Sequence, residues 1–350
     1  MNFKNEKVLI IGHTGFKGSW LASWLSLYDA KIYGISKFSI NMSFNYKSTN
    51  IKKKLVKEYN FDLRNFHKLN KVVNQIKPKY IFFLAAQSLV GESYKQPKST
   101  WTINLLGALN FFEVVKNISF KSNIVVVTSD KCYLNIKKKN GYKEEDILGG
   151  TDPYSASKAS VEILYKSYFE SFFKYKKNIN SGTARAGNVI GGGDLSENRI
   201  VPDVIKSWKK NTKLDLRNPF STRPWQHVLE PLGGYLKFAK YLNKGKFNGE
   251  SFNFGPSIKN STTVKKLIIE MSKYLNHFKY SVTNKKKFHE HKLLQLNCQK
   301  AKKKLKWKPR LNFKETVSFT TDWYIEKFKN KKKDMREFNI RQIEKFIKYN

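Results

Sequence analysis

The stretch that decides the fold is Lys7-Val8-Leu9-Ile10-Ile11-Gly12-His13-Thr14-Gly15-Phe16-Lys17-Gly18, near the N-terminus. Its first five residues form a short apolar run, which is typical of a buried strand. The glycines that follow have the spacing GxxGxxG and open a helical pattern. Glycines let the backbone turn sharply and approach a phosphate closely, and a helix N-terminus offers free N–H groups. This context predicts a nucleotide-binding loop that contacts its ligand through Gly12, Thr14, Gly15, Phe16 and Gly18.

Short apolar runs and helical patterns alternate from this loop to about residue 180. The expected strands are Lys7–Ile11, Lys31–Ile35, Glu58–Phe61, Tyr80–Leu84 and Ile124–Thr128. The expected helices between them are Phe16–Tyr28, Phe66–Lys77, Ser99–Val115 and Pro153–Tyr175. Strands separated by helices imply a parallel sheet with helices on both faces. The predicted fold class is therefore α/β, with a Rossmann-type doubly wound parallel sheet.

The second half of the chain is less regular, because Gly, Asn, Pro and Arg become frequent from about Thr183 to Arg223. Later expected segments are a strand at Ser251–Phe254, a helix at Thr262–Leu275, a solvated loop at Lys285-Lys286-Lys287 and a charged helical tail at Lys327–Asn350. We expect residues 1–183, with returning segments near 224–256, to form the nucleotide-binding Rossmann domain. A smaller, irregular α/β C-terminal substrate lobe is expected from residues 184–223 and 257–330, followed by a helical tail at 331–350.

The composition favours a folded intracellular protein. The chain has 350 residues, 40% of them hydrophobic, which is enough to form a core. Its two cysteines, Cys132 and Cys298, are far apart, which argues against a disulfide framework and favours a reducing, cytoplasmic compartment. No apolar run approaches the ~20 residues that a transmembrane helix needs. We therefore expect no membrane partner.

The net charge of +40 comes from 67 Lys+Arg against 27 Asp+Glu. Such a balance can indicate nucleic-acid binding. The lysines, however, are spread along the whole chain, so we expect no nucleic-acid partner and only favourable steering of an anionic substrate. His289-Glu290-His291 could ligate a metal, but it lies beside a lysine run in an expected loop, and no metal site is predicted.

Two further motifs carry acid–base chemistry. Tyr154-Ser155-Ala156-Ser157-Lys158 is a YxxxK pattern on an expected helix, where residues four apart share one face. A lysine ammonium beside a phenol favours the phenolate, which can take a proton from a sugar hydroxyl. Ser129, Asp130 and Lys131 follow the fifth expected strand, and ligands of such sheets bind beyond the carboxyl ends of the strands.

Together, GxxGxxG and YxxxK resemble the extended short-chain dehydrogenase/reductases. Longer runs resemble the CDP-glucose 4,6-dehydratases along essentially the whole chain: Gly12–Leu21, Thr128–Tyr133, Gly149–Lys158, Ala184–Asp194, Arg217-Asn218-Pro219, Arg223–Pro231, Asp334-Met335-Arg336 and Gln342-Ile343. The resemblance implies an NAD-dependent lyase that dehydrates a nucleotide-activated hexose, CDP-glucose, to a 4-keto-6-deoxy product. Such an enzyme serves deoxysugar and surface-polysaccharide biosynthesis, including lipopolysaccharide O-antigen.

The resemblance also implies roles for individual residues. Ser129, Tyr154 and Lys158 correspond to the catalytic triad, while Asp130 and Lys131 correspond to the acid and base of dehydration. The cofactor-lining residues would include Asp62, Leu63, Ala85, Ala86 and Gln87, besides the glycine loop, Tyr154 and Lys158. The substrate-binding residues would be Ser93, Asn188, Arg199, Arg217, Arg223 and His227. We expect a homo-oligomer, either a dimer or a tetramer.

Several alternatives stay open at this point. Lys37 ends the second strand where an acidic residue would favour NAD, so NADP is not excluded. A sugar-nucleotide epimerase, or a 4,6-dehydratase acting on a dTDP- or GDP-hexose, is the nearest rival function. Asp130-Lys131 argues against the epimerase, whose chemistry needs only the triad. Gly91 stands where relatives carry a basic residue, with an effect that the sequence does not reveal.

Overall fold

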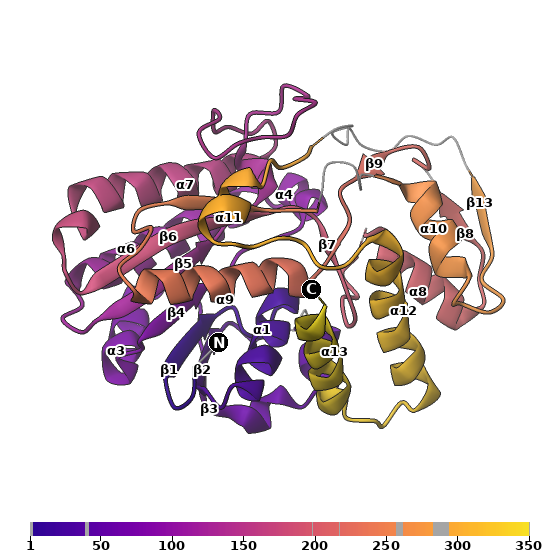
Figure 1. Ribbon diagram of the computed structural model, residues 1–350, viewed down its shortest axis with the longest axis horizontal. Coiled ribbons are helices and arrows are strands. Elements are labelled where there is room, and N and C mark those ends of the chain that lie inside the picture. The colour runs from indigo at the N-terminus through magenta and orange to yellow at the C-terminus, as the bar shows by residue number, and fades with distance from the viewer. Residues whose placement is uncertain are drawn as a thin grey trace.

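A seven-stranded parallel sheet organises the molecule, with strands in the order β11-β6-β5-β4-β1-β2-β3 (Figure 1). The computed structural model describes residues 3–38, 42–197, 199–216, 218–256, 262–282 and 294–349. The strands of this sheet are β1 (Lys7–Ile11), β2 (Lys31–Ser36), β3 (Leu55–Asn60), β4 (Tyr80–Phe83), β5 (Ser122–Val127), β6 (Ile179–Ala186) and β11 (Ser251–Phe254). The predicted doubly wound α/β fold is confirmed.

Helices cover both faces of this sheet. On one face lie α1 (Phe16–Leu27) and α9 (Leu229–Asn243). Helix α13 (Arg336–Lys348) packs against α1, and α12 (Phe313–Lys329) joins the same hydrophobic core. On the other face lie α3 (Phe66–Ile76), α6 (Gly107–Asn117) and α7 (Pro153–Ser171). The shorter helices are α2 (Phe44–Ser48), α4 (Val90–Lys95), α5 (Pro97–Trp101), α8 (Ile200–Lys210), α10 (Val264–Ser272) and α11 (Gln299–Lys304).

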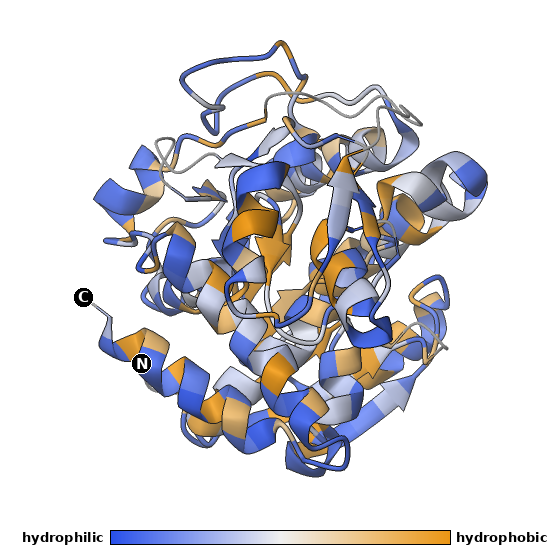
Figure 2. Ribbon diagram, turned by 90° about the vertical axis from the view of Figure 1, so that its right-hand side faces the viewer, coloured by the Kyte–Doolittle hydropathy of each residue, from blue (hydrophilic) through white to orange (hydrophobic). Residues whose placement is uncertain are grey.

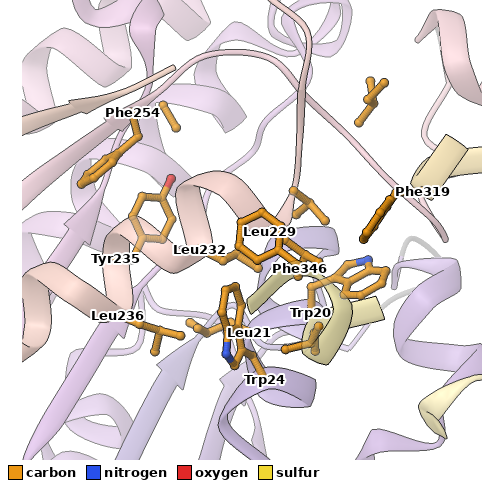
Figure 3. Packing of buried hydrophobic residues seen from close by; sticks show 14 of the residues in the cluster. Trp20, Leu21, Trp24, Leu229, Leu232, Tyr235, Leu236, Phe254, Phe319 and Phe346 are labelled. Atoms are coloured by element: carbon orange, nitrogen blue, oxygen red, sulfur yellow. The ribbon is translucent and has the colours of Figure 1, made fainter. Parts of the chain in front are cut away.

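The two cores follow from the alternation of side chains along the strands. In β1, Val8 and Ile10 join the core beneath α1 and α9, while Leu9 and Ile11 join the opposite core. Figure 3 shows the first core, where aromatic rings of α1 meet leucines of α9 and rings from β11, α12 and α13. Large aromatic side chains bury much apolar surface, so this cluster fixes the C-terminal helices against the nucleotide-binding half.

A smaller region lies at the carboxyl end of the sheet, on the right in Figure 1. It contains α8, α10 and three short strand pairs. These pairs are β7 (Val189–Ile190) with β10 (Gln226–His227), β8 (Leu214–Leu216) with β13 (Tyr280–Val282), and β9 (Thr222–Arg223) with β12 (Thr262–Thr263). Figure 2 shows hydrophobic segments gathered inside and hydrophilic segments outside. None of the described helices is long and apolar enough to cross a membrane.

Three expected helices differ in detail from the structure. The segment expected as Ser99–Val115 is interrupted by a π-helical stretch at Thr102–Leu106. The segment expected as Thr262–Leu275 begins as strand β12, and helix α10 starts only at Val264. The charged tail is not one helix, because α12 ends at Lys329 and α13 begins at Arg336. The lysine loop expected at 285–287 lies outside the described residues.

Candidate active site

The glycine loop between β1 and α1 has the close contacts that only glycine permits. Gly12 has a φ of +98°, and a Cβ atom there would lie 2.8 Å from the amide nitrogen of Ala85. A Cβ at Gly18 would lie 2.1 Å from the carbonyl oxygen of Gly12. Gly15 is exposed and precedes α1, which has no side-chain cap. The positive end of α1 is therefore available to an anion such as a dinucleotide diphosphate.

His13, for which the motif predicted no role, holds this loop in place through its buried side chain. Its ring is fully buried, with Nε2 2.9 Å from Glu58 Oε1 and Nδ1 3.0 Å from the hydroxyl of Ser36. Gly34 makes room for it, because a Cβ there would lie 2.5 Å from the ring. The amide of Thr14 donates to the same Ser36 hydroxyl at 3.3 Å. The loop is thus connected to β2 and β3 by side chains as well as by the backbone.

The expected adenine-side residues lie at the end of β3. Asp62 is tied to two cations, with Arg64 Nη2 at 2.7 Å and Lys37 Nζ at 3.3 Å. Hydrogen bonds from Arg64 hold the pKa of Asp62 well below its usual range, against the opposing effect of burial. The carbonyl oxygen of Leu63 accepts from Asn110 Nδ2 at 3.0 Å.

The turn after β4 is held by a buried asparagine that had no sequence signal. Asn104, in the π-helical stretch, accepts from the Gln87 amide at 2.7 Å and donates to the Ser157 hydroxyl of α7 at 2.9 Å. The Gln87 side chain donates to the Leu89 carbonyl oxygen and to the Thr100 hydroxyl of α5, and accepts from the Leu89 amide. Ala85 and Ala86 lie in this turn and are partly buried. The expected cofactor-lining turn therefore faces the glycine loop and is connected to the helix that carries Tyr154.

The catalytic candidates converge at the carboxyl end of β5. Asp152 caps α7 by accepting from the Ser155 amide at 2.9 Å, and Pro153 occupies the first helical position, so the helix begins just before Tyr154. Tyr154 and Lys158 lie one turn apart and are 7% and 5% exposed. Burial of both groups makes their charge states sensitive to a few neighbouring side chains.

Asp130 and Lys131 form an ion pair in the same place. Lys131 Nζ lies 3.2 Å from Asp130 Oδ1 and 3.1 Å from Asn188 Oδ1, and the Ser129 hydroxyl donates to Asp130 Oδ1 at 2.9 Å. Asp130 is 2% exposed. A Cβ at Gly187 would lie 3.6 Å from Asp130 Oδ2, so this second oxygen points toward a residue without a side chain. An acid and a base are thus held side by side beyond β5.

The pKa values of the YxxxK pair differ from the simple expectation. Burial raises the pKa of Tyr154 to about 12, while a hydrogen bond with Ser129 lowers it and the charge of Asp130 raises it. Burial lowers the pKa of Lys158 to about 8, against an opposing effect of Glu162. The groups that lower the phenol pKa in this structure are Ser129 and Arg199 and not the expected Lys158, and burial outweighs both.

Lys17 is a further cation in the crevice, and it lies inside the glycine motif itself. Its Nζ lies 3.4 Å from the hydroxyl of Tyr235. Burial lowers its pKa to about 7; the charge of Asp130 opposes this shift, and Lys158, Arg199 and Lys131 add to it. The sequence signal was available, because a lysine between two glycines of a phosphate loop adds a charge to its helix dipole.

The structure describes three of the four expected substrate-binding residues between 188 and 223. Asn188 and Arg199 lie at the crevice, where Arg199 pairs with Asp194 at 2.9 Å and its charge acts on Tyr154. Arg223 lies on β9, where its Nη1 donates to the Thr222 carbonyl oxygen at 2.8 Å. Arg217 lies outside the described residues.

Ser93 and His227 are enclosed by the protein's own atoms, and direct substrate contact stays a prediction for both. Both are 0% exposed. The Ser93 hydroxyl donates to the Val90 carbonyl oxygen at 2.7 Å within α4. The His227 ring packs against Trp20 and Phe319, and burial lowers its pKa to about 3. Tertiary packing places these polar residues in the core.

No candidate metal centre is present in the described ranges, where no three His, Cys, Asp or Glu side chains gather. The motif His289-Glu290-His291 lies outside those ranges. The described crevice instead gathers Lys17, Lys131, Lys158 and Arg199 around the buried Asp130. Such a charge distribution suits a phosphorylated or otherwise anionic ligand.

Comparison with known proteins agrees with this geometry. The family model described as GDP-mannose 4,6 dehydratase matches residues 9–320. A CDP-glucose 4,6-dehydratase of Salmonella typhimurium is 37% identical over 92% of this chain and 91% of its own length. A UDP-glucose 4-epimerase of Mycoplasma genitalium is 26% identical over 91% of this chain and 96% of its own length.

Among solved structures, a dTDP-glucose 4,6-dehydratase of Bacillus anthracis in complex with NAD superposes with a TM-score of 0.75 at 21% identity. That match covers 94% of this chain and 99% of the other, so the fold is shared throughout. The matched residues 9–320 include the glycine loop, the Asp130–Lys131 pair and the Tyr154–Lys158 pair. The chain therefore belongs to the GDP-mannose 4,6 dehydratase family, within the extended short-chain dehydrogenase/reductases that its motifs resemble.

Proposed function

We propose that this protein is an NAD-dependent CDP-glucose 4,6-dehydratase, a lyase that removes water from the hexose and leaves a 4-keto-6-deoxy sugar. The observation that carries the proposal is the ion pair between the buried Asp130 and the partly exposed Lys131, beside Ser129, Tyr154 and Lys158. Oxidation at C4 needs only a base such as Tyr154. Elimination across C5 and C6 needs a second base and an acid, and this pair provides both.

The residues around the glycine loop fit a bound NAD. Gly12, Gly15 and Gly18 bring the backbone and the uncapped end of α1 to the diphosphate, while Ala85, Ala86 and Gln87 would line the nicotinamide half. Asp62 and Leu63 would lie on the adenine side. When bound, NAD accepts a hydride and later returns it, so that the enzyme needs no external reductant. We propose residues 1–183 and the returning segments near 224–256 as the part that holds it.

The protein's own residues then account for the proton movements. Tyr154 takes the proton of the C4 hydroxyl, held in place by Ser129 and Lys158. One proton passing across the 3.2 Å contact from Lys131 to Asp130 turns the ion pair into a neutral amine and a carboxylic acid. The amine removes the C5 proton and the acid protonates the departing C6 oxygen, which leaves as water. The ion pair is thereby restored. Lys131 then returns a proton to C5, and the proton held by Tyr154 replaces it on Lys131, so that every group ends as it began.

Desolvation by a bound sugar favours this internal proton transfer, because burying a charged pair costs more than burying its neutral form. Asn188 helps, because its side-chain oxygen accepts from Lys131 at 3.1 Å and keeps the amine directed. Arg199 would hold the diphosphate with Arg217 and Arg223, since guanidinium groups suit phosphate oxygens. We assign these residues to the substrate lobe.

The experiment that tests the function is incubation of the purified protein with NAD and, separately, CDP-, dTDP-, GDP- and UDP-hexoses. Mass spectrometry should find loss of one water from CDP-glucose, with no net accumulation of NADH. An epimerised hexose of unchanged mass would instead support the epimerase alternative, which the Mycoplasma relative favours. Stoichiometric NADH release would support a dehydrogenase. Tight binding to DNA that ignores sugar nucleotides would support the distant nucleic-acid alternative.

We further propose that the enzyme acts in the cytoplasm as a homo-oligomer. Cys132 and Cys298 are both free, as is typical of a reducing compartment. Exposed apolar side chains on and just after α7 include Ile163, Phe172 and Tyr175, which are 58%, 40% and 73% exposed. Such residues are common in contacts between subunits. Light scattering would distinguish a monomer from a dimer or tetramer.

A further inference from the structure

Glu162 is a buried carboxylate that the proposed chemistry does not use. It lies one turn after Lys158 on α7 and is 3% exposed. Tyr154, Lys158 and Glu162 follow one another at intervals of four residues, so they share one face of the helix. A buried charge is costly unless it is paired and hydrogen-bonded, so its position calls for a physical reason.

Three donors, from the end of β5 and from β6, converge on this carboxylate. Glu162 accepts from the hydroxyl of Thr128, from the hydroxyl of Thr183 at 2.8 Å and from Arg185 Nη2 at 2.9 Å. Thr128 directly precedes Ser129, and the other two residues lie on β6. The Ser251 hydroxyl of β11 lies 2.8 Å from the Thr183 hydroxyl and accepts from Arg185 Nη2 at 3.3 Å. Glu162 therefore joins the helix of Tyr154 to the strand end that carries the Asp130–Lys131 pair.

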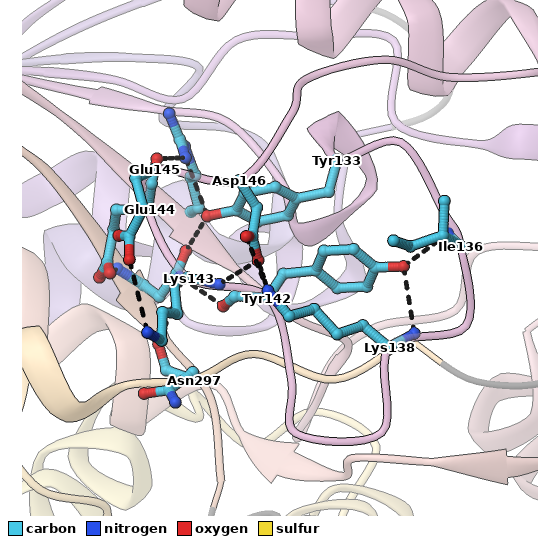
Figure 4. A network of polar contacts seen from close by, with 11 residues as sticks. Tyr133, Ile136, Lys138, Tyr142, Lys143, Glu144, Glu145, Asp146 and Asn297 are labelled. Atoms are coloured by element: carbon cyan, nitrogen blue, oxygen red, sulfur yellow. Dashed lines mark hydrogen bonds and ion pairs between the residues drawn. The ribbon is translucent and has the colours of Figure 1, made fainter.

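Arg185 is itself anchored on its far side. Its Nη1 donates to the Tyr133 hydroxyl at 2.8 Å and to the Glu144 carbonyl oxygen at 2.9 Å. The rings of Tyr133 and Tyr142 stack in the loop that follows Asp130 and Lys131, as Figure 4 shows, with their centroids 5.2 Å apart. The Glu162 carboxylate is thus held in one position from several directions.

The charges that face Lys158 come from three elements besides its own. Glu162 lies on α7, Cys132 on the 3₁₀ turn after β5 and Lys17 on α1, while Arg185 of β6 lies behind Glu162. Burial raises the pKa of the Cys132 thiol far above its usual range, so this thiol stays neutral. Among these groups, Glu162 is the anion that favours a charged Lys158.

We propose that Glu162 is a positioning residue, whose buried carboxylate fixes the Tyr154–Lys158 face of α7 against β5 and β6 and holds the positive charge on Lys158. The importance of this charge for turnover rests on the proposed function, because it supports the phenolate that takes the C4 proton. The electrostatic coupling itself does not depend on the substrate. It can therefore be measured even if the substrate assignment fails.

The test is a double-mutant cycle of urea unfolding with Glu162→Gln and Lys158→Met, at pH 7 and pH 9.5. Lys158 is charged below its pKa of about 8 and neutral above it. At pH 7, E162Q should lower the urea midpoint more in the Lys158 background than in K158M. At pH 9.5 the two effects should be equal. Absence of coupling at pH 7, or equal coupling at both pH values, overturns the proposal.

Thr183→Val is the matched control, because it removes one neutral hydrogen bond to the same carboxylate at 2.8 Å without removing charge. It should show no pH-dependent coupling to K158M. The alkaline limb of kcat/KM should move to lower pH by about one unit in E162Q and stay in place in T183V. An equal movement in both variants overturns the role of the charge.

The double variant E162Q/R185M keeps the test decisive if E162Q alone does not fold. It removes both members of the buried pair, which proteins tolerate better than loss of one. The same pH-dependent coupling to K158M is expected, with smaller amplitude because the cation behind Glu162 is also lost. Coupling of zero at pH 7 in this background overturns the proposal.

Discussion

Replacement of Asp130 by Asn should separate C4 oxidation from loss of water. The side chain accepts from Ser129 and Lys131 through Oδ1, at 2.9 and 3.2 Å, while Oδ2 points toward Gly187. An asparagine can keep both contacts through its carbonyl oxygen and place its amide where Oδ2 was. The variant therefore keeps the local structure and loses only the charge and the transferable proton.

The two half-reactions should respond in opposite directions. The charge of Asp130 raises the pKa of Tyr154, so its removal should leave C4 oxidation as fast as before or faster. Protonation of the C6 oxygen has no replacement donor, and a positioned acid contributes about 10²- to 10⁴-fold. Product formation should therefore slow by at least about a hundredfold, which corresponds to ~2.7 kcal/mol in the barrier.

The assay is a single turnover with excess enzyme, followed by absorbance at 340 nm and by mass spectrometry of the quenched sugar. D130N should accumulate the 340 nm signal and form little 6-deoxy product. Asp146→Asn is the control, because it removes the same charge from a pair with Lys138 in the loop beyond the site. Product formed by D130N at the wild-type rate would refute the reasoning. Loss of both signals would place Asp130 in the oxidation step instead.

Three further predictions follow from the same site. Tyr154→Phe should reduce turnover by at least about a thousandfold with little change in the thermal midpoint or in nucleotide binding by calorimetry, and turnover within tenfold of wild type would exclude it as the base. Gly18→Ala should weaken NAD binding at least about tenfold in calorimetry, because the new Cβ would lie 2.1 Å from the Gly12 carbonyl oxygen. Gly91→Ala is the control: no atom lies within 4 Å of its new Cβ, so this variant should bind NAD as tightly as the wild type. Lys17 has a pKa of about 7 and is therefore about half protonated at pH 7. A bound diphosphate should raise this pKa. Binding of NAD or CDP-glucose should therefore take up about 0.4 proton at pH 7, and less at pH 6, where Lys17 is already mostly protonated. Calorimetry in buffers of different ionisation enthalpy measures this uptake, and Lys17→Met should abolish it; equal uptake in both proteins would contradict the assignment.

Local pattern in the sequence was enough to predict the fold class and most of the strands of this protein. The strands Lys7–Ile11 and Ser251–Phe254 have the predicted bounds, because a short apolar run bounded by turn residues has few other stable structures. The glycine spacing likewise predicted a strand, a turn and a helix, since only glycine fits the backbone contact between Gly12 and Ala85. The catalytic motifs were visible for the same reason, because each is short and contiguous.

Tertiary structure decided what each polar side chain faces. His227 and Ser93, which the resemblance assigned to substrate binding, are fully buried, while Lys17 of α1 lies close enough to Asp130 and Lys158 for their charges to act on it. The partners of Glu162 come from strands 21 to 34 residues away, among them Thr183. Such contacts depend on how strands order themselves in the sheet, which local periodicity does not encode. Burial then sets the charge states, because the cost of a buried charge depends on every group packed around it.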